Sequence, residues 1–120
     1  MSVLLTGSLA AFTVVALLGA TIAYDLFRGY PADKQITLVH AGMAVLGALL
    51  AIGAALQGDN RVYLNIALVV VIALLGFTAV TKRYKTGQVQ KGLIFAHAGL
   101  AVVCYLILAA VVLGLFKPGA

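Results

Sequence analysis

The sequence predicts an all-α integral membrane protein that folds as a bundle of four transmembrane helices. Composition is the first reason: 64% of the 120 residues are apolar and only 9% are charged, and the mean hydropathy is +1.17. A soluble domain is about half apolar and about one quarter charged. Eight basic and three acidic side chains cannot keep this much hydrocarbon in water, so a water-soluble globule is excluded.

The apolar residues gather in four runs, which is the second reason. Each run has roughly the 20 residues that a helix needs to cross about 30 Å of hydrocarbon. Three polar connections separate them, and the first contains Gly29 and Pro31, which interrupt a helix. The expected spans are residues 3–24, 36–56, 62–81 and 93–116, within a single domain that covers 1–120.

The basic residues predict the orientation in the membrane. With four spans, the first and third connections share one side, and they carry six of the eight basic residues. Because basic loops stay in the cytoplasm, both chain ends are expected outside it, and the net charge of +5 indicates topology rather than nucleic-acid binding. The expected location is the bacterial inner membrane. The six basic residues are Arg28, Lys34, Lys82, Arg83, Lys85 and Lys91.

An internal repeat is the third reason for the four-helix bundle. A shift of 57 residues, without a gap, places residues 14–21 on 71–78 and His40-Ala-Gly on His97-Ala-Gly. The only two histidines are thereby superposed. We interpret the match as two tandem-repeated helical hairpins, about 3–57 and about 60–114, related by a twofold axis along the membrane normal.

The paired histidines are the candidate site. An imidazole in hydrocarbon is costly without a partner, and such groups usually mark function. His40 and His97 are expected at equal depth on the second and fourth helices, about 6 Å below the cytoplasmic boundary. Small residues follow each histidine and are expected to leave room for a flat ligand: Gly42, Ala44, Gly99 and Ala101.

Haem b is the cofactor that this arrangement favours. Two axial imidazoles from two helices hold such a haem, so His40 and His97 are the predicted iron ligands. Its propionates need cationic partners, which the adjacent connections supply. The four candidates are Arg28, Lys34, Lys85 and Lys91.

The four-span layout with its cross-helix His pair resembles membrane b-type cytochromes built on four-helix bundles. The resemblance lies in the architecture and the two histidine positions, and it implies an electron-transfer subunit of a larger respiratory or quinone-linked complex. Other membrane subunits and a quinone are then the expected partners. Those cytochromes often carry a second His pair, whereas the two histidines here allow one haem at most.

Other interpretations remain open. Each histidine alone would suit the magnesium of a (bacterio)chlorophyll, and an accessory or scaffold subunit without cofactor would use the pair only for hydrogen bonding. A proton-coupled exporter lacks its membrane-embedded carboxylate, because Asp25, Asp33 and Asp59 all lie in connections. No motif of a soluble enzyme is present, so catalysis by this chain is not expected.

Two geometric expectations accompany the haem hypothesis. Each ligand histidine should donate its other ring proton to a nearby acceptor, expected to be the carbonyl of Ile36 or Leu93, or a group such as Thr37. The facing imidazole nitrogens should lie about 4 Å apart, twice a metal–nitrogen bond of about 2 Å.

Overall fold

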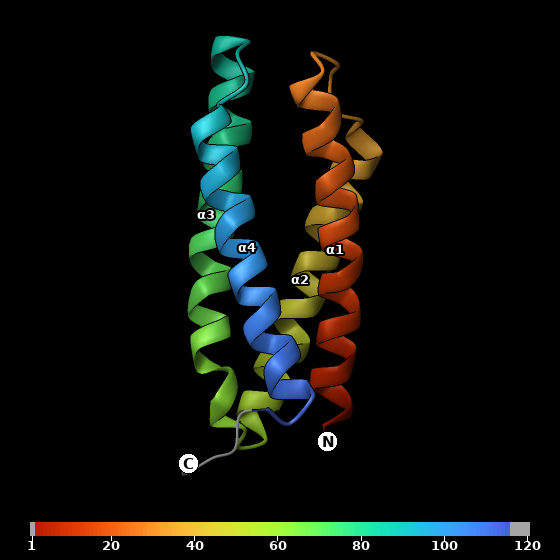
Figure 1. The fold of residues 1–120 in the computed structure, drawn as a ribbon, viewed down its shortest axis with the longest axis vertical. Helices are drawn as coiled ribbons and strands as arrows, with labels where there is room; N and C mark the ends of the chain where they lie inside the picture. The colour runs from red at the N-terminus through yellow and green to blue at the C-terminus, as the bar shows by residue number, and fades with distance from the viewer. Residues whose placement is uncertain (1, 116–120) are drawn as a thin grey trace.

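The computed structural model describes residues 2–115, which form four long helices and one short 3₁₀ turn (Figure 1). All four helices are long and apolar enough to cross a membrane, which confirms the predicted all-helical fold with four candidate spans. The helices are α1 (Val3–Phe27), α2 (Lys34–Leu56), α3 (Tyr63–Thr86) and α4 (Lys91–Val112), and the turn η1 (Asn60–Val62) precedes α3.

The helices extend beyond the apolar runs at the polar connections. The helix α1 continues to Phe27 and α3 to Thr86, while α2 and α4 begin at Lys34 and Lys91. At its other end α4 stops at Val112, short of the expected residue 116, which lies outside the described residues; Gly114, with a φ of 74°, follows the helix. Backbone hydrogen bonding does not require apolar side chains, so a helix can project past the hydrocarbon until a cap ends it. Gly87, with a φ of 70°, ends α3 in the left-handed conformation that favours glycine.

The chain forms two hairpins, α1 with α2 and α3 with α4 (Figure 1). The α1–α2 and α3–α4 connections lie at one end of the bundle, which we call the loop end. The start of α1, the end of α4 and η1 lie at the opposite, terminal end. The hairpins approach each other at the terminal end and diverge toward the loop end.

The tightly packed core lies at the terminal end. Leu5 of α1, Val62 of η1 and Leu108 of α4 are each at most 1% exposed and belong to one cluster with Ala54 of α2. Elsewhere large apolar side chains cover the outside, such as Leu74, which is 61% exposed. In a membrane-spanning protein these exposed side chains contact lipid.

In each hairpin one buried polar side chain links the two helices by a hydrogen bond. In the first hairpin, Ser8 Oγ of α1 donates to the carbonyl of Gly47 on α2 at 2.8 Å. In the second, Asn65 Nδ2 of α3 donates to the carbonyl of Cys104 on α4, also at 2.8 Å. Bonds of this kind in a membrane contribute about 0.6 kcal/mol on average, so their main effect is to fix the register of each hairpin.

An ion pair closes the connection between α2 and α3. Arg61 Nε donates to Asp59 Oδ1 at 2.9 Å, and Arg61 Nη2 donates to Asp59 Oδ2 at 2.7 Å. The paired hydrogen bonds favour the carboxylate form, and they hold the pKa of Asp59 below its ordinary value.

Replacing Arg61 with Gln is expected to raise the pKa of Asp59 toward its ordinary value of about 3.9. Because the folded-state pKa is lowered, the ion pair stabilises the fold above that ordinary value, and the stabilisation is lost as the pH falls through the lowered pKa. A carbon-13 NMR titration of the Asp59 carboxyl group measures the change. An unchanged titration curve in the variant would contradict the assignment to Arg61.

Candidate cofactor site

The structure brings the two histidines together between the hairpins. His40 lies on α2 and His97 on α4, and both side chains are half-buried. Their ring centroids are 6.3 Å apart and the ring planes are inclined by 60°. Among residues 2–115, no Cα atom of α2 lies within 8 Å of one on α4. The two imidazoles therefore approach each other between helices whose backbones remain apart.

Both imidazoles are anchored in the same way through Nδ1. His40 Nδ1 lies 2.9 Å from the carbonyl oxygen of Val15, and His97 Nδ1 lies 2.8 Å from that of Ile72. A carbonyl can only accept, so each Nδ1 carries the proton and donates it. In a neutral imidazole this leaves the Nε2 lone pair free, and neutral Nε2 is a common metal ligand.

The acceptors differ from those expected from the sequence. Ile36, Leu93 and Thr37 were expected to accept the Nδ1 protons, but the acceptors lie on the preceding helix of each hairpin. The reason is packing: α1 lies closely against α2, and α3 against α4, so a neighbouring carbonyl comes within reach. That carbonyl has a second lone pair beyond its helical hydrogen bond.

Two glycines on the neighbouring helices, which sequence spacing did not connect with the histidines, lie against the rings. A Cβ atom built at Gly19 would be 2.9 Å from His40 Cε1, and one at Gly76 would be 2.8 Å from His97 Cε1. These positions are related by the same 57-residue shift as the histidines. The repeat was therefore the signal that could have identified them.

The small residues that follow each histidine in the sequence do not lie beside its ring. Gly42 and Gly99 are exposed, and a Cβ at either would meet nothing within 4 Å. A residue two positions along a helix is rotated by about 200°, so it faces away from the imidazole. Ala44 and Ala101 are half-buried one turn further along the helix. The space beside each ring therefore comes from glycine on the neighbouring helix.

The predicted propionate partners lie at the loop end and are exposed. Arg28 follows α1, and its guanidinium carbon lies 5.0 Å from the ring centres of both Tyr24 and Tyr30, so its position is defined by two aromatic faces. Lys34 and Lys91 begin α2 and α4, and Lys85 lies in the last turn of α3.

The histidines lie near the first residues of their helices. Each is the seventh residue of its helix, because α2 and α4 begin at Lys34 and Lys91. Six helical steps place them about 9 Å along the axis from those first residues. The distance along the axis from His40 to Leu56, the last residue of α2, is about 24 Å. The His pair is therefore much closer to the loop end.

Two other features of the helices serve packing. The Tyr105 hydroxyl lies 2.8 Å from Thr13 Oγ1 on α1. Since Thr13 Oγ1 donates to the carbonyl of Leu9, Tyr105 is the donor in this pair. Cys104 is buried against Asn65. Within residues 2–115, no three or more His, Cys, Asp or Glu side chains form a group that could hold a metal ion.

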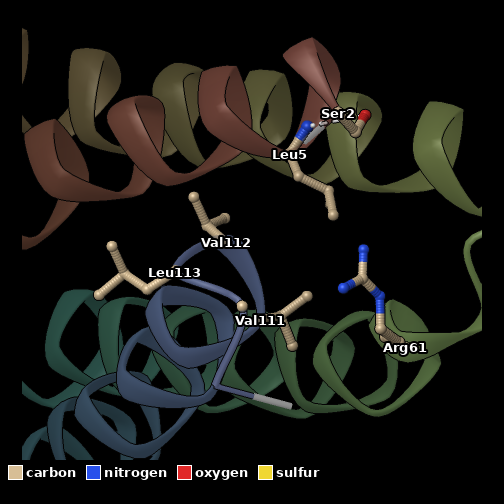
Figure 2. Close-up of a pocket in the computed structure, with 7 residues that line it drawn as sticks. Ser2, Leu5, Arg61, Val111, Val112 and Leu113 are labelled. Carbon is tan, nitrogen blue, oxygen red and sulfur yellow. Dashed lines mark hydrogen bonds between the residues drawn. The ribbon is translucent and has the colours of Figure 1, made fainter. Parts of the chain in front are cut away.

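A pocket of about 270 Å³ lies at the terminal end, away from the histidines (Figure 2). The guanidinium of Arg61 points into it between Leu5 and Val111, and the other lining residues are mainly apolar. The Asp59 carboxylate already pairs with this guanidinium. Among the described residues that line the pocket, Arg61 is the only one with a titratable side chain, and it is already paired.

The candidate site is thus a pair of half-buried imidazoles with matched anchoring on the two hairpins. Comparison with protein-family models, curated proteins and solved structures finds no match to this chain, so functional inference depends on the geometry of the pair.

Proposed function

We propose that this protein is a small haem b-binding electron-transfer subunit of a membrane complex, in which His40 and His97 would both ligate one haem iron. The complex would be respiratory or quinone-linked, with catalysis carried out by its other subunits. Such a site needs two imidazoles with available Nε2 atoms, and the distance between the two rings must allow both to bind one metal.

The separation of the rings is the observation that carries the proposal. If both Nε2 atoms lie on the line between the ring centres, two metal–nitrogen bonds of about 2 Å and about 1 Å from each nitrogen to its ring centre give a centroid distance of about 6 Å. The observed distance is 6.3 Å. If the two rings were hydrogen-bonded directly to each other, one ring would have to donate a proton to the other. A neutral imidazole has one N–H, and in both rings the Nδ1 proton is already donated to a backbone carbonyl.

The chain would contribute binding, orientation and exclusion of water. His40 and His97 would hold the iron, and the haem when bound would supply reversible one-electron chemistry. The apolar helices would keep water from the iron. Cations at the loop end would pair with the propionates, and both effects tune the reduction potential. The candidate cations are Arg28, Lys34, Lys85 and Lys91.

The interpretation as a tandem duplication receives support from matching contacts. The bonds His40–Val15 and His97–Ile72 are related by the 57-residue shift, and so are Ser8–Gly47 and Asn65–Cys104. A duplicated hairpin provides two equivalent ligands to a site on its twofold axis. The repeat therefore supports a single iron shared by the two halves rather than two unrelated histidines.

The absorption spectrum of the protein purified from membranes tests the proposed function. For the wild-type protein, the expected reduced-minus-oxidised difference spectrum has the sharp bands of a b-type haem. Red-shifted pigment bands would instead identify a (bacterio)chlorophyll subunit. A featureless spectrum, after expression with an ample haem supply, would contradict the proposal and favour an accessory subunit without cofactor.

The proposed orientation places the loop end in the cytoplasm, because six basic residues lie at or beside the two loop-end connections. A reporter enzyme that works only outside the cytoplasm, fused after Ala120, is expected to be active. The same reporter inserted after Gly87 should be inactive. The opposite pattern would reverse the orientation and place the His pair near the outer face.

A further inference from the structure

We propose that Gly19 and Gly76 are positioning residues that fix the tautomer of the two histidines. Each glycine lets an imidazole approach a backbone carbonyl of the neighbouring helix, so that Nδ1 carries the proton and Nε2 stays available. The consequence for metal binding rests on the proposed function. The tautomer itself is a property of the cofactor-free protein and can be measured without haem.

The same local arrangement occurs in both hairpins. The accepting carbonyl, Val15 or Ile72, lies four residues before the glycine, which is one helical turn. The imidazole from the next helix therefore spans that turn, with Nδ1 on the carbonyl and Cε1 against the glycine. Because the Nδ1 hydrogen bond is 2.8–2.9 Å long and the ring is rigid, Cε1 must also lie close to the neighbouring helix, at the glycine.

A methyl group at either glycine would be incompatible with this arrangement. A Cβ at Gly19 would lie 2.9 Å from His40 Cε1 and 3.4 Å from Nδ1. A Cβ at Gly76 would lie 2.8 Å from His97 Cε1 and 3.0 Å from Nδ1. The two Cε1 distances are under 3.0 Å, which real Cβ contacts essentially never show, so the ring must shift. Since the imidazole is rigid, relieving the contact moves the whole ring, including Nδ1, away from the carbonyl.

Loss of the Nδ1 bond would affect the ligand directly. A histidine that donates its Nδ1 proton to a carbonyl has a fixed tautomer and orientation, and it is a more basic ligand. Without that bond the proton can move to Nε2, and a protonated Nε2 has no lone pair for a metal. Mutation of such hydrogen-bond partners typically lowers metal affinity by about 10- to 100-fold.

The chain provides matched control glycines. Gly42 and Gly99 are also inside helices, on α2 and α4, but a Cβ at either meets nothing within 4 Å. Replacing any of these four residues with Ala gives a similar change in helix propensity, which favours Ala by about 1 kcal/mol. A difference between the two groups of variants therefore reports contact with the imidazole rather than helix stability.

The test is nitrogen-15 NMR of histidine-labelled, cofactor-free protein in lipid nanodiscs. In the wild type both histidines should be in the Nδ1–H form. Gly19→Ala should shift His40 toward Nε2–H and leave His97 unchanged, and Gly76→Ala should do the reverse. Gly42→Ala and Gly99→Ala should change neither. Nε2–H histidines in the wild type would overturn the proposal even if a variant failed to fold.

A haem titration of the same samples then tests the consequence for the ligands. Gly19→Ala and Gly76→Ala should each bind haem about 10- to 100-fold more weakly, while the two control variants bind like the wild type. Equal affinity in all variants would overturn the positioning role. Tautomer shifts in a protein that binds no haem in any form would show that the proposed function is wrong and that the glycines position no metal ligand.

Discussion

Replacing either His40 or His97 with Ala is expected to abolish six-coordinate haem binding, to the same extent in both cases. The two rings have equivalent anchors and lie 6.3 Å apart, so each would supply one axial ligand to the same iron. Removing a ligand should weaken haem binding by more than the roughly 100-fold seen on removing a ligand's hydrogen-bond partner. Haem content and the spin state of any residual haem are read from absorption spectra.

Two controls accompany these variants. Cys104→Ala alters a buried residue of the same helix as His97, and Lys117→Ala removes a charge outside the residues that the structure describes. Both should retain a low-spin, six-coordinate haem. If one histidine variant kept the wild-type spectrum while the other lost it, the histidines would not share an iron, and the symmetric site would be refuted.

Replacing Leu108 with Ala is expected to lower the free energy of unfolding in the membrane by about 2 kcal/mol. Leu108 is 1% exposed and contributes to the cluster at the terminal end, so the change leaves a cavity there. The loss should be near the low end of the range for soluble cores. A leucine that leaves the core for lipid keeps an apolar environment, so only its packing contacts are lost.

Unfolding of the purified protein in mixed detergent micelles measures this loss. Leu106→Ala is the matched control: Leu106 lies on the same helix but is 60% exposed, so its replacement should change the free energy of unfolding little. Equal losses for the two variants would contradict the assignment of Leu108 to the core that joins the hairpins.

The sequence was sufficient to predict the four spans and to identify the His pair. Twenty-residue apolar runs admit few structures in a membrane other than helices. The helix ends were less predictable, because residues 82–86 and Lys34 are polar yet helical. Helix ends at a membrane surface depend on caps such as Asp33, whose carboxylate accepts from the amide of Ile36, and not on hydrophobicity.

The surroundings of the imidazoles were not predicted, and the reason is geometric. Sequence spacing tells which residues share a face of one helix, so it directed attention to Gly42 and Ala44 beside His40. The ring instead turns toward α1, where Val15 accepts its proton and Gly19 leaves the space. That contact depends on how α1 and α2 are rotated against each other. Only the repeat indicated that Gly19 had an equivalent at Gly76.

The most direct test of a shared iron is a titration of haem into the cofactor-free protein, followed by absorption and electron paramagnetic resonance. The structure offers two equivalent imidazoles for one metal. Saturation at one haem per chain, with a low-spin, six-coordinate iron, is the expected result. Saturation at two haems per chain, or a high-spin, five-coordinate iron at saturation, would contradict it.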